Sequence, residues 1–180
     1  MQTLVNFYDP YIQGKNTEGR TLDYILSQPD AWLERTHNFI QWLFPLPRPS
    51  QYNPTAPLLD RATAEYMGEH PRFQEQLRLS VIRMMWFYGF QVQFDPAHNI
   101  SFQVAEDPVT LENPYRRWFK RQDHNHLRIS RMIKSLRYFD MQEEAIIVYS
   151  AFVSINEQWG LLVPDPTVRR WTDASEENIY

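Results

Sequence analysis

Apolar residues recur at helical spacing in the N-terminal quarter of the chain. Ser27 and Asp30 match the pattern of a capping box, and the residues after them predict one helix that continues to Phe44. One face of this helix is a predicted buried stripe of Leu33, His37, Ile40 and Phe44. Trp42 projects from the opposite side, so it either meets a second element or is exposed to a partner. We interpret His37 as a hydrogen-bonded core residue rather than as a ligand.

The middle of the chain predicts a connector followed by two helices. Five of the 13 prolines fall between residues 45 and 57 and indicate an extended connector. Asp60 then suits the N-cap of a short helix ending near Glu69, and Pro71 suits the first turn of a longer helix. Gly89 can end that longer helix in a left-handed turn. The apolar face of the longer helix consists of Phe73, Leu77, Val81, Met84 and Tyr88.

The C-terminal half predicts a hairpin, two helices and a tail. Residues 90–104 alternate apolar with polar side chains, which predicts a small β-hairpin. A basic amphipathic helix is clear from His126 onward, and its apolar face consists of Ile129, Met132, Ile133 and Leu136. Asp140 and Glu143 match a second capping box, before a helix that is apolar on almost every face and is therefore predicted to be central. Residues 161–180 predict an irregular tail laid over the domain.

These elements together predict the fold class. We expect a mainly α, single-domain orthogonal helical bundle of about five to seven helices, with a minor β-hairpin near residues 90–104. The single domain covers residues 1–180, with a core at about 7–159.

Composition excludes several kinds of site. The chain has 180 residues and no cysteine, so disulfides, thiolate catalysis and cysteine-bound zinc are excluded. The longest uncharged apolar run, from Ala145 to Ile155, is too short for a bilayer span of about 20 residues. The N-terminus also lacks the pattern of a signal peptide. We therefore expect a cytoplasmic protein without a transmembrane segment, and we expect any membrane association to be peripheral.

Charge is distributed unevenly around the formal net charge of −4. Between Tyr115 and Arg137 there are eight basic residues and one acid, so these 23 positions carry +7 and the other 157 carry −11. Aromatic residues interleave with the basic ones near position 118, a mixture used for stacking on single-stranded nucleic acid. Three uses of this region stay open: internal or solvated charge, binding of an acidic protein or peptide, and binding of nucleic acid.

Signatures of catalysis are missing from the sequence. There is no glycine-rich phosphate loop, no nucleophile elbow and no His-Glu-x-x-His pattern. The run from Asp123 to His126 offers imidazole and carboxylate groups, but two histidines at positions i and i+2 do not share a helix face. We expect this run to make capping and loop contacts, and we predict no catalytic residue, no metal site and no cofactor.

Three blocks of sequence resemble a known family. Residues 33–46, 53–59 and 124–136 read LERTHNFIQWLFPL, NPTAPLL and HNHLRISRMIKSL. They resemble the conserved N-terminal domain of the opioid growth factor receptor family, over about Phe7 to Trp159. The resemblance implies a receptor that binds an enkephalin-type peptide and slows cell proliferation at the nuclear envelope and in the nucleus, without a seven-helix bundle. It implies no catalytic residue.

We therefore predict a non-catalytic binding module for a peptide or protein. The alternative is a module that binds nucleic acid or an acidic protein through the basic region 115–137. The candidate basic residues are Arg116, Arg117, Lys120, Arg121, Arg128, Arg131 and Lys134. The candidate exposed aromatic residues are Trp42 and Trp118.

Overall fold

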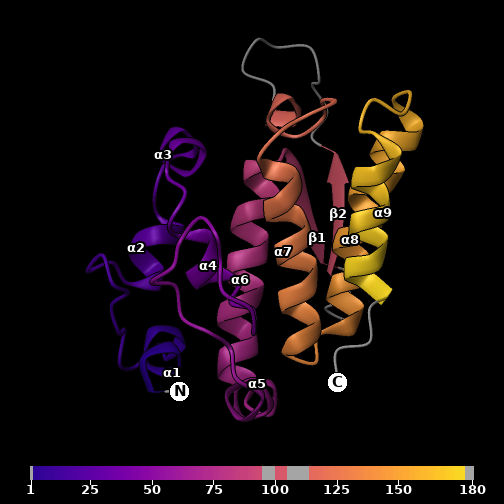
Figure 1. Ribbon diagram of the computed structural model, residues 1–180. Coiled ribbons are helices and arrows are strands. Elements are labelled where there is room, and N and C mark those ends of the chain that lie inside the picture. Colours follow the sequence, from indigo (N-terminus) through magenta and orange to yellow (C-terminus); the bar gives the residue numbers. More distant parts are fainter. Residues whose placement is uncertain (1, 95–99, 105–113, 177–180) are drawn as a thin grey trace. The chain divides into compact units, whose positions relative to one another are not determined.

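The computed structural model describes residues 2–94, 100–104 and 114–176. These residues form nine α-helices, one 3-10 turn and one two-stranded sheet (Figure 1). The predicted class, mainly α with a minor hairpin, is confirmed. More helices are present than the expected five to seven, because one predicted helix is broken and the predicted tail is helical.

The chain divides into two compact units. The first unit contains Met1–Val81 and Tyr138–Met141, and the second contains Ile82–Arg137 and Gln142–Tyr180. The single-domain organisation therefore stays a prediction. In the described parts of the chain, no helix is long and apolar enough to cross a membrane.

The first unit contains five short helices and the start of a longer one. Their bounds are α1 Gln2–Tyr8, α2 Leu22–Leu26, α3 Asp30–Arg35, α4 Ile40–Leu43, α5 Arg61–Gly68 and α6 Pro71–Phe87. Asp60 accepts a hydrogen bond from the Thr63 amide (2.8 Å), which confirms the predicted cap of α5. The proline-rich connector before α5 contains no helix, and its ends meet in a bridge between Leu46 and Leu58.

The predicted continuous helix from Ser27 to Phe44 is wrong. The chain leaves helical geometry at Thr36, and α4 begins only at Ile40. Hydrogen bonds to Asn38 hold the break, since its side chain accepts from Arg20 (3.0 Å) and its carbonyl accepts from Asn53 (3.2 Å). Tertiary contacts therefore override the local periodicity.

This break changes the environment of two side chains singled out in the sequence. His37 is exposed, so its assignment to the core is wrong. Trp42 is 1% exposed and its ring lies 5.2 Å from that of Phe7, so its assignment as an exposed contact for a partner is also wrong. Because residues 36–39 form a turn instead of continuing the helix, His37 lies on the surface and the side chains of α4 are buried.

The second unit contains the end of α6, a hairpin and three further helices. The hairpin pairs β1 (Phe90–Phe94) with β2 (Ile100–Val104), as predicted, and Gly89 precedes it with the expected positive φ of 98°. The remaining elements are η1 Pro114–Arg117, α7 Asn125–Tyr138, α8 Gln142–Gln158 and α9 Asp165–Glu176. Helix α8 lies against β2 and α9 (Figure 1).

Three expectations for the C-terminal part are wrong. Residues 165–176 form α9 rather than an irregular tail, because prolines at the start of a helix are tolerated and Trp171 is fully buried. Helix α8 is not buried all round, since Ile146 is 48% exposed. It begins at Gln142, so Asp140, which has a φ of 58°, lies outside the predicted capping position.

Candidate functional site

The aromatic and basic segment around η1 binds the C-terminal end of α6. The Tyr115 hydroxyl donates to the Gly89 carbonyl (2.6 Å), and the Arg117 guanidinium donates to the Phe87 carbonyl (2.5 Å). The Trp118 indole donates to the Tyr88 carbonyl between them (3.0 Å). Because a helix ends with carbonyls that lack intrahelical partners, these three side chains serve as its cap.

The start of α7 in turn fixes the segment around η1. The Asn125 side chain donates to the Arg117 carbonyl (2.8 Å), and His126 Nε2 donates to the Trp118 carbonyl (2.7 Å). The Asn125 side-chain oxygen accepts from Arg128 (3.1 Å). Since Asn125, His126 and Arg128 are buried, these polar groups depend on one another for hydrogen bonding.

Trp118 is also the centre of an aromatic cluster. Its ring lies 6.0 Å from Phe90, 4.8 Å from Phe152 and 6.3 Å from Trp171. The Trp171 indole donates to the His126 carbonyl (3.0 Å), which links α9 to the start of α7. We call the set of Tyr115, Arg117, Trp118, Asn125, His126 and Trp171 the Trp118 network.

The predicted basic residues do not form one exposed face. Arg128 is 5% exposed, so its place on that face is wrong. Trp118 is fully buried, so its assignment as an exposed aromatic contact is wrong as well. Both side chains form buried hydrogen bonds, Arg128 to the Asn125 side chain and Trp118 to the Tyr88 carbonyl.

The other predicted basic residues differ in exposure. Arg117, Arg131 and Lys134 are half-buried, and burial lowers the pKa of Arg131 to about 10. The exposed ones are Arg116, Lys120 and Arg121. Among the predicted basic residues, Arg116, Lys120 and Arg121 therefore expose the most side-chain surface to a partner.

The Asp123 to His126 run makes the expected loop contacts. Asp123 accepts from the Asn125 amide (2.8 Å) and pairs with Lys120 (2.9 Å). Burial alone would raise the pKa of Asp123, but these two partners hold it below its ordinary value. His124 is exposed whereas His126 is buried, so the two imidazoles face different environments.

The structure reveals exposed residues that the sequence interpretation missed. Trp86, in the last turn of α6, is 60% exposed. The signal was available, because helical periodicity places Trp86 roughly opposite Phe73 and the buried stripe. Arg169 and Arg170 are exposed on α9, and they were overlooked because that segment was interpreted as irregular.

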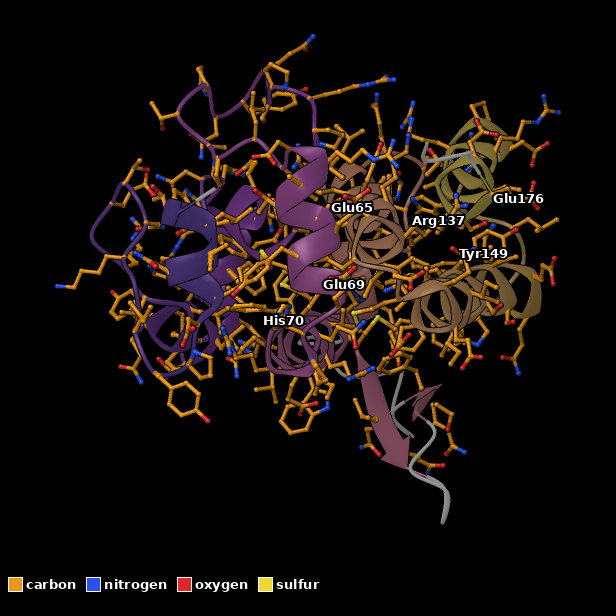
Figure 2. All side chains as sticks on the ribbon, turned by 90° about the horizontal axis from the view of Figure 1, so that it is seen from below. Glu65, Glu69, His70, Arg137, Tyr149 and Glu176 are labelled. Atoms are coloured by element: carbon orange, nitrogen blue, oxygen red, sulfur yellow. The ribbon has the colours of Figure 1, made fainter. Side chains whose placement is uncertain are left out.

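Other titratable side chains hold helices together within their own units. In the first unit, His70 Nδ1 lies 2.6 Å from the Tyr66 carbonyl, and Glu65 pairs with Arg61 (2.7 Å) (Figure 2).

In the second unit, Arg137 donates to Gln142 (2.8 Å) and the Tyr149 hydroxyl lies 3.0 Å from the Thr172 hydroxyl (Figure 2). Across the described residues, no group of three histidine or acidic side chains is placed to hold a metal ion.

Comparison with known proteins places the chain in a family. The model of the opioid growth factor receptor (OGFr) conserved region matches residues 5–157. The chain belongs to the opioid growth factor receptor family. The match includes η1, the start of α7 and the basic residues of the segment between them, so most of the Trp118 network lies in the conserved region of this family.

Relatives of the opioid growth factor receptor family share part of the chain. The human opioid growth factor receptor is 32% identical over 107 residues, which cover 58% of this chain and 14% of the human protein. The rat receptor is 32% identical over 104 residues, covering 58% of this chain and 17% of the rat protein. The chain thus spans only a small part of the length of these relatives. No solved structure matches it.

Removal of one hydroxyl tests the cap on α6. Tyr115→Phe keeps the ring but leaves the buried Gly89 carbonyl without this donor, so we expect a loss of about 1–3 kcal/mol in the free energy of unfolding. Urea denaturation measures it. Tyr52→Phe is the control, because Tyr52 is 74% exposed and its change should stay within about 0.5 kcal/mol. Equal effects of the two substitutions would contradict the role of the Tyr115 hydroxyl.

His126 predicts a pH dependence of stability. Burial lowers the pKa of His126, and Lys120 and Arg170 lower it further, although the Trp118 carbonyl and Asp123 oppose the shift. In the window below the ordinary histidine pKa of about 6.5, the unfolded chain then binds more protons at this site than the folded chain. The contribution of His126 to the free energy of unfolding is therefore fully present above a pH of about 6.5 and is lost as the pH falls below that value.

The comparison variant for this effect is His126→Gln, whose amide can also donate to the Trp118 carbonyl. We expect the melting temperature of the unchanged protein to fall more steeply than that of the variant as the pH drops from about 7.5 to about 5.5. Because all other titrating groups are the same in both proteins, the difference isolates His126. Parallel curves would show that this histidine does not titrate differently in the folded state.

Proposed function

We propose that the chain is a non-catalytic binding module for a peptide, of the opioid growth factor type that the names of its relatives indicate. Membership of the family supports this, since the matched region covers residues 5–157. Because the match covers only a small part of the relatives, their receptor activity is a proposal for this chain.

Trp86 is the observation that carries the binding role. A tryptophan that is 60% exposed presents a large apolar surface to water, and such residues are frequent hot spots of protein interfaces. Its helix turn is rigid, because the adjacent carbonyls of α6 are bound by Tyr115, Arg117 and Trp118. A rigid aromatic anchor loses little conformational entropy when a partner binds.

The histidines support a role without catalysis. His126 is buried and its Nε2 is used by the Trp118 carbonyl, while His70 is bonded to the Tyr66 carbonyl. His37 and His124 are exposed in different units. His98 lies outside the described residues. Two of the four described histidines are thus bonded to backbone carbonyls rather than to a nucleophile.

The hollow that the structure describes in the first unit does not suit a peptide. This hollow, beside Asp9 and Asp23, has room for about one water molecule. This is too small for a peptide side chain. The nucleic-acid alternative is not favoured either, because Tyr115 and Trp118, which would stack on bases, are buried.

Calorimetry with an enkephalin-type peptide tests the proposal. We expect heat of binding with the unchanged chain, and an affinity at least about tenfold weaker for Trp86→Ala because the anchor is removed. Leu161→Ala is the matched control, because Leu161 is 64% exposed in the same unit, and its affinity should be unchanged.

Two results would overturn parts of the proposal. Absence of both heat and a shift in melting temperature with the unchanged chain removes the opioid-peptide role. Binding that Trp86→Ala leaves intact places the peptide elsewhere on the protein.

A further inference from the structure

Five exposed cations lie on two segments of the second unit that contact each other. Three come from the segment that follows Tyr115 and two come from α9, and they are Arg116, Lys120, Arg121, Arg169 and Arg170. We call them the cationic surface. They differ from the basic face predicted from sequence, since Arg128 is buried and the arginines of α9 replace it.

Contacts inside the unit bring the two groups of cations together. The start of α7 and the start of α9 lie at the same end of the second unit (Figure 1), where the Trp171 indole donates to the His126 carbonyl (3.0 Å). The rings of Trp118 and Trp171, which adjoin the two groups in sequence, are 6.3 Å apart. Lys120 and Arg170 both lower the pKa of His126, as expected if each lies near it.

The charge of the cationic surface is largely uncompensated. Lys120 pairs with Asp123 (2.9 Å), but in the described part of the chain the four arginines form no ion pair. The exposed acids of α9, Asp165, Asp173 and Glu176, form none with them either within those residues. Within the described residues, the four arginines therefore carry positive charge that no ion pair compensates.

Burial of the neighbouring rings favours a carboxylate partner over single-stranded nucleic acid. A guanidinium forms two parallel hydrogen bonds with either a carboxylate or a phosphate, and four of the five cations are arginines. Single-stranded nucleic acid also requires rings for stacking, but Trp118 is buried and Phe119 packs edge-on against Trp159 (5.5 Å).

We propose that the cationic surface binds an aspartate- and glutamate-rich segment of a partner protein. The proposal goes beyond the binding of an opioid-type peptide and does not depend on Trp86. Because the charges are exposed, binding should be fast to form and should weaken as salt screens the surface.

Fluorescence anisotropy with a labelled oligoglutamate peptide tests this surface in the full chain. We expect binding at low ionic strength that weakens with salt, and a loss of about tenfold or more in affinity for Arg169→Glu/Arg170→Glu. Arg116→Glu/Arg121→Glu should weaken binding similarly, which guards against a folding defect in one variant. Thermal melting of each variant checks that it is folded.

The matched control is Arg35→Glu/Arg48→Glu, which changes the net charge equally at exposed positions of the first unit. Its affinity should stay within about twofold of the unchanged protein. Three results would overturn the proposal: no binding of oligoglutamate at low ionic strength, equal weakening by control and test variants, or tighter binding of oligothymidylate that the test variants abolish. None of them bears on the calorimetry with Trp86→Ala, so the two proposals fail independently.

Discussion

The consecutive carbonyls of Phe87, Tyr88 and Gly89, at the last residue of α6 and the two residues after it, need donors from outside the helix, and the way they are satisfied organises the second unit. Tyr115, Arg117 and Trp118 donate to them, so η1 is fixed against α6. The carbonyls of η1 then require donors of their own, which Asn125 and His126 supply from the first turn of α7. Each of these carbonyls thus accepts from a later segment of the chain, and the Trp171 indole, which donates to the His126 carbonyl, adds α9 to the same series of hydrogen bonds.

This constraint decides which charges are available for function. A segment rich in arginine and aromatic residues looks like a binding surface in the sequence, but its rings and Arg117 are used to cap a helix. Arg116 lies between two of these capping residues and Arg121 follows them, and both are exposed. One segment therefore contributes both to the stability of the unit and to its exposed positive charge. The conserved region of the family includes all of these positions.

Sequence reasoning succeeded where local physics determines the structure. The cap at Asp60, the positive φ at Gly89 and the hairpin follow from short-range rules. It failed where contacts between residues far apart in the sequence determine the structure. Hydrogen bonds to Asn38 from Arg20 and Asn53 interrupt a helix that periodicity alone would continue. The candidate site was only partly predictable for the same reason. Exposure of Trp86 follows from helical spacing, whereas burial of Trp118 depends on carbonyls 30 residues away.

The exchange of tryptophan indole protons with solvent, followed by nuclear magnetic resonance, tests the central role of the Trp118 network most directly. The indole N–H groups of Trp118 and Trp171 are buried and donate to backbone carbonyls, so they should exchange slowly with deuterium. The indole of Trp86 is on an exposed side chain and should exchange rapidly in the same sample. If the Trp118 proton exchanged as fast as that of Trp86, the indole would not cap α6 and the account of the second unit would be contradicted.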